Sequence, residues 1–298
     1  MQLKDLKTEL RNPASEHLDT MTSLELVTAM NQADAEVPRA IQQVLPQIAL
    51  AVDAIARRFA EGGRLIYVGT GTSGRIGALD SSECPPTFGT DPNMVQFLIA
   101  GGETALARAA EASEDSAELG RSDMAMKQPG NQDAVVGLAA SGRTPYTIGA
   151  LEYAREQGAI TIAIACNTGS ALAKAAETSI EVDVGPEILT GSTRLKAGTA
   201  QKLVCNMLTT GAMSQLGYVY SNLMVNLHLK NEKLLERGIS IVQTLAQVDR
   251  AVALETLKAA DMRVPLALVI LKAGVNATEA SRRLHKAKGN VRKALLLE

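Results

Sequence analysis

The strongest constraint on the fold is a short apolar run that passes directly into a glycine-rich turn. Residues 65–68 (LIYV) have the composition of a buried strand, and the turn GTGTSG follows at residues 69–74. Glycines let a backbone approach a ligand closely, and the helix that the turn opens presents free N–H groups to an anion. Thr72 and Ser73, next to Gly71, add hydroxyl donors. The stretch therefore predicts a strand–turn–helix unit that can bind an isolated phosphate.

The same turn matches the pattern G-x-G-x-x-G, so a dinucleotide site is an alternative. That site needs an uninterrupted helix and then a strand that ends in an acidic residue about twenty positions on. Here we expect Pro85 and Pro86 to end the helix early, and Glu103 comes too late in the chain. A plain tight turn without a ligand is the third possibility. A P-loop is excluded because no Gly-Lys-Ser/Thr closes the turn.

From residue 65 onward, apolar strand patterns alternate with helical patterns. Such alternation, with strands that are apolar throughout, predicts an α/β fold with a doubly wound parallel sheet covered by helices on both faces. The expected strands are 65–68, 94–100, 134–139, 160–165 and 179–182, and the expected helices between them are 74–82, 104–119, 146–157 and 170–176.

Polar turns follow several of these strands, at the edge where such sheets bind ligands. Ser141-Gly142-Arg143-Thr144 follows the third strand and repeats the Ser-Gly-Arg of residues 73–75. A further polar loop, residues 183–196, contains Ser192. Each hydroxyl could simply cap the next helix. Two such turns facing one crevice favour anion binding, which makes Ser141, Gly142, Arg143, Thr144 and Ser192 candidate binding residues beside Gly71, Thr72 and Ser73.

The flanking segments read as helical. We expect residues 1–56 to form an N-terminal arm and helices, in which Pro46 bends or divides a long helix. Residues 57–220 would form the α/β domain, with a helix from 197 to 216. Residues 221–298 would form a helical region with no strand except the ambiguous run 266–271. It would end in a small three-helix module of the UBA type around Gly289.

Composition excludes several classes of function. A net charge of −2 gives no electrostatic case for nucleic acid or an anionic membrane, and no apolar run is long enough to cross a bilayer. The N-terminal residues are too polar for a signal peptide. Three widely spaced cysteines indicate a reducing compartment rather than disulfides or zinc. His228 and His285 are better interpreted as core and surface residues than as ligands.

Together, the two Ser-Gly-Arg turns resemble the sugar isomerase (SIS) domain, whose members bind phosphosugars. Longer segments resemble one SIS family, the N-acetylmuramic acid 6-phosphate etherases. Leu10 and Leu195 depart from that family's pattern at positions where Gly and Met are frequent. The matching segments are TELRNPAS (8–15), GRLIYVGTGTSGRIGALDSSECPPTFG (63–89), IAGGE (99–103), EASEDS (111–116), AASGRTPY (139–146) and TGSTRLKAGTAQKLVCNMLTTGAM (190–213).

This resemblance implies a cytoplasmic, homodimeric lyase that needs no organic cofactor or metal. Such an enzyme cleaves the D-lactyl ether of N-acetylmuramic acid 6-phosphate to N-acetylglucosamine 6-phosphate and D-lactate, in bacterial cell-wall sugar recycling. Its two catalytic positions match Glu83 and Glu114, the second of which lies on the expected helix 104–119. The resemblance assigns Glu114 as the base and Glu83 as the acid. We expect the N-terminal arm of one subunit to approach the partner's site.

Elementary chemistry agrees with two carboxylates. Once the sugar ring opens to the aldehyde, elimination needs a base for the C2 proton and an acid for the departing C3 oxygen, and water then adds at C3. The acid must hold its proton, which favours a buried position for Glu83. Two competing classes remain. One is a phosphosugar-sensing protein similar to the glucokinase regulatory protein, and the other is an aldose–ketose phosphosugar isomerase that releases no lactate.

Overall fold

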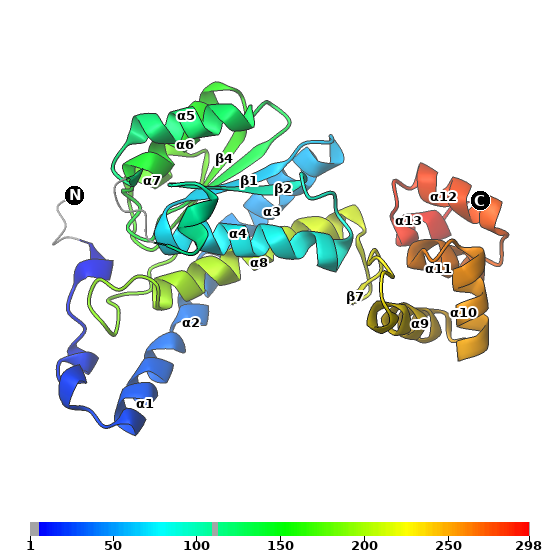
Figure 1. Ribbon diagram of the computed structural model, residues 1–298, viewed down its shortest axis with the longest axis horizontal. Coiled ribbons are helices and arrows are strands. Elements are labelled where there is room, and N and C mark those ends of the chain that lie inside the picture. Colours follow the sequence, from blue (N-terminus) through cyan, green and yellow to red (C-terminus); the bar gives the residue numbers. More distant parts are fainter. Residues whose placement is uncertain (1–5, 109–112, 298) are drawn as a thin grey trace. The chain divides into compact units, whose positions relative to one another are not determined.

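The computed structural model describes residues 6–108 and 113–297, which form two compact units (Figure 1). One unit contains residues 1–82 and 92–209, and the other contains residues 83–91 and 210–298. The first unit holds the β-sheet and the second is mostly helical. Among the described residues, no helix is long and apolar enough to span a bilayer.

The predicted parallel sheet is confirmed. Within the described residues it has five strands in the order β2-β1-β3-β4-β5, and every pairing is parallel. Each strand begins and ends within about a residue of its expected bounds, because the buried apolar runs leave little freedom in where a strand lies. The strands are β1 (Leu65–Gly69), β2 (Val95–Ile99), β3 (Ala134–Leu138), β4 (Ile160–Ala165) and β5 (Thr178–Glu181).

Helices cover both faces of this sheet (Figure 1). On one face, Ile66 and Val135 pack in a cluster with side chains of α5 (Ala117–Lys127), α6 (Pro145–Glu156) and α7 (Ala171–Ala175). On the other face, Tyr67 of β1 contacts α4 (Gly71–Phe88) and α8 (Lys196–Leu216). With β1 between β2 and β3, the chain reverses its winding direction at β1/β3, and parallel sheets bind ligands at such switch points.

Helix α4 corrects one expectation. Pro85 and Pro86 do not end it, since the helix continues to Phe88. Each proline removes one backbone donor, yet Gly89 N–H still donates to the Pro85 carbonyl at 2.9 Å. Cys84 and Phe88 are buried on this last turn. Their burial holds the helix together past the prolines.

The segment after β2 corrects another expectation. Instead of one helix over 104–119, a short 3₁₀ helix, η5 (Glu103–Leu106), is followed by α5, which begins at Ala117. Ser116 caps α5 by accepting a hydrogen bond from the Leu119 N–H. Glu114 therefore lies in a turn before this helix rather than on it. Residues 109–112 of the expected helix lie outside the described residues.

The N-terminal helices match their predicted pattern. Pro38 lies in the first turn of α2 (Val37–Gln42), and Pro46 lies in the first turn of α3 (Leu45–Ala60), so the long apolar pattern is divided into two helices. Before them, α1 (Ser23–Asp34) opens with a capping box between Thr22 and Glu25. No residue of α1 is buried in the single chain.

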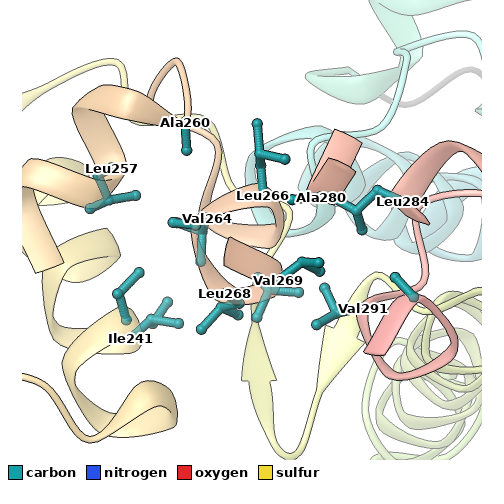
Figure 2. Close-up of a cluster of buried hydrophobic side chains, with 14 of the residues drawn as sticks. Ile241, Leu257, Ala260, Val264, Leu266, Leu268, Val269, Ala280, Leu284 and Val291 are labelled. Atoms are coloured by element: carbon teal, nitrogen blue, oxygen red, sulfur yellow. The ribbon is translucent and has the colours of Figure 1, made fainter. Parts of the chain in front are cut away.

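The second unit is built around its own hydrophobic core (Figure 2). Buried side chains from several helices of this unit pack together, among them Leu257, Val264 and Val291. The expectation of no strand was wrong for a short antiparallel pair, β6 (Val219–Tyr220) and β7 (Leu223–Met224). The ambiguous run 266–271 is helical. The helices are α9 (Glu232–Ala246), α10 (Arg250–Ala259), α11 (Val264–Ala273), α12 (Ala277–Lys286) and α13 (Val291–Leu295).

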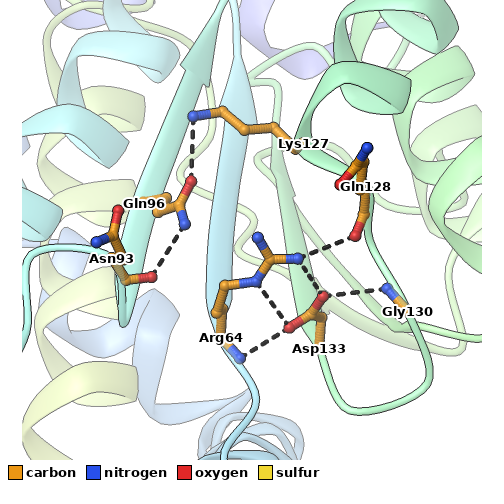
Figure 3. A network of polar contacts seen from close by, with 7 residues as sticks. All are labelled: Arg64, Asn93, Gln96, Lys127, Gln128, Gly130 and Asp133. Atoms are coloured by element: carbon orange, nitrogen blue, oxygen red, sulfur yellow. Dashed lines mark hydrogen bonds and ion pairs between the residues drawn. The ribbon is translucent and has the colours of Figure 1, made fainter.

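A polar network closes the amino-terminal edge of the sheet (Figure 3). Asp133, which precedes β3, accepts three hydrogen bonds from Arg64, which precedes β1, at 2.7 to 3.1 Å. Burial alone would raise the pKa of Asp133, but the hydrogen bonds from Arg64 and Gly130 outweigh it and lower that pKa. The network fixes β1 against β3 at the edge opposite the candidate binding turns.

Candidate active site

The first candidate turn joins β1 to α4. Gly71 begins the helix with a positive φ of 48°, and Gly74 N–H makes an early helical bond to the Thr70 carbonyl at 3.0 Å. The amides of the first turn therefore lack helical acceptors. The turn needs Gly74 because a Cβ there would lie 2.6 Å from Ile99 Cγ1. Thr72 is half-buried and Ser73 is buried, so both hydroxyls are held close to the helix start.

The second candidate turn joins β3 to α6 and lies beside the first, because Gly69 and Leu138 are paired across β1 and β3. Ser141 Oγ accepts a hydrogen bond from Arg143 N–H at 3.3 Å. Thr144 occupies the N-cap position of α6, but its side chain makes no capping hydrogen bond. Helix capping therefore does not account for the Thr144 hydroxyl.

The third polar turn, after β4, supports the second one. The Gly142 carbonyl accepts a hydrogen bond from Leu172 N–H at 2.9 Å. Asn167, which is buried, donates from Nδ2 to the Ala140 carbonyl at 3.2 Å. These two hydrogen bonds tie the turn that carries Ser141 to α7 and to the turn that follows β4.

The N-terminal arm lies against its own chain at this edge of the sheet. Thr8 is completely buried, where its N–H donates to Asn167 Oδ1 and its Oγ1 accepts from Asn167 Nδ2 at 3.0 Å. Lys7 also forms an ion pair with Asp183. The arm is therefore part of the site's own framework, and its expected approach to a partner subunit remains a prediction.

The polar loop before α8 is held by a buried carboxylate. Glu187 accepts hydrogen bonds from the backbone N–H groups of Lys196 at 3.0 Å and Ala197 at 2.9 Å, so it caps α8. Burial raises the pKa of Glu187, and these hydrogen bonds offset part of that rise. Ser192 lies within the loop that this cap anchors and is half-buried.

Glu114 lies beside the turn that joins β1 to α4. Its Oε1 is 3.5 Å from the position that a Cβ on Gly71 would occupy, and its carbonyl accepts from Tyr146 N–H at 3.1 Å. Its carboxylate is therefore held at the N-terminal end of α4.

Glu83 lies elsewhere on α4, twelve residues after Gly71. At a rise of 1.5 Å per residue this is about 18 Å along the helix axis. Glu83 is exposed in the single chain, together with Leu79 one turn earlier. The buried position expected for a general acid is not met within one chain.

Asp80, one turn before Glu83, anchors the middle of α4. It is buried and accepts hydrogen bonds from Tyr67 Oη at 2.9 Å and Asn206 Nδ2 at 2.6 Å. Burial raises the pKa of Asp80, and the hydrogen bonds from Asn206 and Tyr67 limit that rise. This network joins α4 to β1 and α8, and so fixes the direction in which the helix leaves the first turn.

Other reactive side chains lie outside this site. Cys84, Cys166 and Cys205 are buried, and burial raises the pKa of the Cys166 and Cys205 thiols, which disfavours a nucleophilic role for those two. His228 and His285 line a cavity of about 580 Å³ in the helical unit. In the described part of the chain, no group of three metal-ligating side chains could hold a metal ion.

Sequence reasoning missed Gln201, Asn167, Glu187 and Asp80 as residues that shape the site. Ser73 Oγ donates to Gln201 Oε1 at 2.9 Å, although the two residues lie far apart in the sequence. The only sequence signal for Gln201 was its place in the segment GSTRLKAGTAQK, and a sequence pattern does not show which residue it contacts. Buried amides and carboxylates of this kind have no periodic signal.

A parallel sheet with hydroxyl-bearing turns at its switch point defines a class, the SIS-domain proteins. Residues 109–211 match the SIS domain family, and residues 47–155 match the glucokinase regulatory protein N-terminal SIS domain family. A phosphoheptose isomerase structure from Francisella tularensis has the same fold, with a TM-score of 0.53 and 18% identity over 65% of this chain and 100% of that one.

Closer relatives narrow the family. The chain is 52% identical to N-acetylmuramic acid 6-phosphate etherase 2 of Lactiplantibacillus plantarum, over 99% of this chain and 100% of the relative. It is 52% identical to N-acetylmuramic acid 6-phosphate etherase of Serratia proteamaculans, over 99% of each chain. The chain belongs to the N-acetylmuramic acid 6-phosphate etherase family.

Proposed function

We propose that this protein is a lyase that cleaves the D-lactyl ether at C3 of N-acetylmuramic acid 6-phosphate. The products are N-acetylglucosamine 6-phosphate and D-lactate, and the reaction belongs to cytoplasmic recycling of bacterial cell-wall sugar. The observation that carries the proposal is identity of about half the residues over nearly the whole length of relatives with that name. The paired hydroxyl turns at the β1/β3 switch point support a phosphosugar ligand.

In the proposed binding mode, the α/β domain of residues 57–220 holds the phosphate. The first turn of α4 supplies unpaired N–H groups and the hydroxyls of Thr72 and Ser73. Ser141 and Thr144 supply hydroxyls from the neighbouring turn, and Ser192 approaches from the loop before α8. Gly71 and Gly142 let the backbone adopt positive φ at the two turns, and Arg143, which is exposed, adds positive charge at the rim.

The reaction then proceeds from the ring-opened aldehyde. Glu114 removes the C2 proton, which the C1 carbonyl acidifies. The C3–O bond breaks with its electron pair going to oxygen, and Glu83 gives that oxygen a proton as D-lactate leaves. Water adds at C3 and gives one proton to Glu83, Glu114 returns its proton to C2, and ring closure gives N-acetylglucosamine 6-phosphate. Overall, one ether bond and one water molecule are consumed, and each product gains one hydroxyl group.

A homodimer is the second part of the proposal, because the single chain leaves apolar surface uncovered. Helix α1 buries no residue and exposes Leu24 and Val27, although helices of this length are marginal in water without packing. Leu79 is half exposed on the same face of α4 as Glu83. We infer that a second copy covers these faces and that Glu83 of the partner subunit completes the site containing Glu114.

Release of D-lactate tests the activity. Incubation with N-acetylmuramic acid 6-phosphate should release one D-lactate per sugar. Binding without lactate would instead indicate a sensing protein, which the match to the glucokinase regulatory protein SIS family makes the leading alternative. Conversion to a ketose would indicate an isomerase.

Solvent deuterium separates the two glutamates. Glu114→Gln should lose both lactate release and exchange of the C2 proton, while the sugar phosphate still binds. Glu83→Gln should lose lactate release by a factor on the order of 10²–10⁴ and, where the carbanion lives long enough to return, should still exchange C2. NMR in D₂O follows both signals. Rapid C2 exchange by Glu114→Gln would overturn the assignment of the base.

Mixing the two inactive variants tests the shared site. In a statistical mixture about half of the dimers combine both variants, and each has one intact site, so about a quarter of wild-type activity should return. Each variant alone, at the same total concentration, is the control. No recovery after subunit exchange would contradict a partner-supplied Glu83.

A further inference from the structure

Gln201 has a buried side-chain amide next to Ser73, in the β1–α4 turn that we propose binds phosphate. It lies in the second turn of α8 and is 1% exposed, yet its Nε2 has no hydrogen-bond partner among the described residues. Its Oε1 accepts the Ser73 hydroxyl at 2.9 Å. A buried N–H without an acceptor lowers the stability of the folded protein. The Gln201 amide is such a group, and it lies next to the turn that we propose binds phosphate.

Close packing between α8 and α4 limits the conformations that the Gln201 side chain can adopt. Helix α8 packs closely on the first turns of α4, since a Cβ on Gly198 would lie 3.6 Å from Thr72 Cγ2 and 3.7 Å from Ile76 Cδ1. Gln201 lies almost one turn further along α8, directly against Ser73. Rotation of the amide about its last side-chain bond is the change that needs least room.

That rotation exchanges the roles of the two groups. With Oε1 toward Ser73, the serine proton points at the glutamine and is withheld from a ligand. With Nε2 toward Ser73, the amide donates to Oγ and the serine proton is free to point outward. The second arrangement also satisfies the buried N–H, and it leaves a carbonyl oxygen unpaired, which proteins tolerate more readily than an unpaired N–H.

We propose that Gln201 is a positioning residue that presents the Ser73 hydroxyl to the substrate phosphate by turning its amide. An anion accepts a hydrogen bond from the Ser73 hydroxyl and so favours the arrangement in which Nε2 donates a hydrogen bond to Oγ. The hydrogen bond to the anion is strengthened because the serine oxygen accepts a proton while giving its own. This inference rests on the proposed phosphate site and assigns to it a residue that does not touch the ligand.

Selective labelling observes the turn directly. The full-length protein is prepared with [¹⁵N]glutamine and [¹⁵N]serine, and the Gln201 and Ser73 signals are assigned from Gln201→Met and Ser73→Ala. Titration with N-acetylglucosamine 6-phosphate, and separately with inorganic phosphate, should shift both the Ser73 backbone amide and the Gln201 side-chain amide. In Ser73→Ala the Gln201 side chain should no longer respond.

Affinities supply an independent measure. Gln201→Met keeps the length of the side chain but cannot donate, and should raise the dissociation constant for N-acetylglucosamine 6-phosphate on the order of tenfold. In the Ser73→Ala background the same change should have almost no effect, because the hydroxyl it positions is gone. Gln215→Met, at an exposed residue in the last turn of α8, is the matched control and should bind as the wild type does.

The outcomes separate this inference from the site on which it rests. If the Ser73 amide shifts but the Gln201 side chain does not, or if the two substitutions are additive, Gln201 only fills space and the inference is wrong. If neither signal shifts at saturating ligand, the phosphate turn itself has been misassigned, and both conclusions fail together.

Discussion

The turn that carries Ser141 depends on a glycine that no other residue can replace without strain. Gly142 has a φ of 67°, and a Cβ there would lie 2.3 Å from Ser170 Cβ and 2.8 Å from Ser170 Oγ. Ser170 cannot move freely, because its Oγ caps α7 by accepting from Ala173 N–H at 3.1 Å. Gly142→Ala should therefore displace either the turn or the cap.

The size of the effect follows from two contributions. A left-handed conformation costs a residue with a Cβ about 1–2 kcal/mol, and overpacking costs about 1–3 kcal/mol. Gly142→Ala should then lower the free energy of unfolding by about 2–5 kcal/mol. Gly169→Ala is the matched control, since Gly169 has the same φ of 67° but nothing within 4 Å of its Cβ position. It should lose only the conformational part, about 1–2 kcal/mol.

Urea unfolding followed by circular dichroism measures the free energy of unfolding of both variants. The rate of D-lactate release shows whether the turn that carries Ser141 still functions. A second substitution isolates the clash. Adding Ser170→Gly to Gly142→Ala removes the atoms in collision and should recover most of the overpacking part, since a Gly cap loses only about a few tenths of a kcal/mol. Equal destabilisation by Gly142→Ala and Gly169→Ala would refute the reasoning, because it would mean that contact with Ser170 contributes nothing.

Three further predictions concern charge and hydrogen bonding in the same unit. Ser141→Ala should weaken binding of N-acetylglucosamine 6-phosphate by about ten- to a hundredfold in calorimetry, through loss of a charge-assisted hydrogen bond of about 1.5–3 kcal/mol, and an unchanged affinity would remove Ser141 from the site. Burial raises the pKa of Asp80 in the folded state above its ordinary value of 3.8. The free energy of unfolding of the wild type, relative to that of Asp80→Asn, should therefore fall as pH rises from 3.8 through the raised pKa. An increase over that pH range would contradict the burial argument. Asp133 has a lowered pKa, so its contribution relative to Asp133→Asn should be present above 3.8 and vanish as pH falls through the lowered value, as urea unfolding at a series of pH values would show.

Much of the fold could be read from the sequence because burial leaves a local pattern. The strands of the sheet are apolar throughout and bounded by turn residues, so each was placed within about a residue. The turns at their carboxyl ends then followed from the rule that parallel strands bring these ends to one edge. Pro46 was correctly expected to divide a helix, since it lies in the first turn of α3.

The two errors have different origins, one in tertiary burial and one in a local helix cap. Pro85 and Pro86 were expected to end α4, but buried Cys84 and Phe88 hold its last turn in place. Glu114 was expected on a helix, but the Ser116 cap starts that helix later and leaves Glu114 in a turn beside Gly71. The first error depends on burial, which the sequence does not show directly, whereas the second depends on a hydrogen bond from Leu119 N–H to Ser116 at the start of the helix.

Two anchoring contacts on helix α4 bear on the proposed site. Its first turn carries Ser73, which α8 holds through Gln201, and its middle is fixed by Asp80 between Tyr67 and Asn206. In the proposed reaction, the phosphate and the C2 base lie at the N-terminal end of α4, whereas Glu83, the proposed acid, is exposed beside Leu79. A second copy of the chain that packed on this face would cover Glu83 together with Leu79. In the proposed homodimer, assembly therefore both buries apolar surface and completes the site, and mixing the two inactive variants tests this.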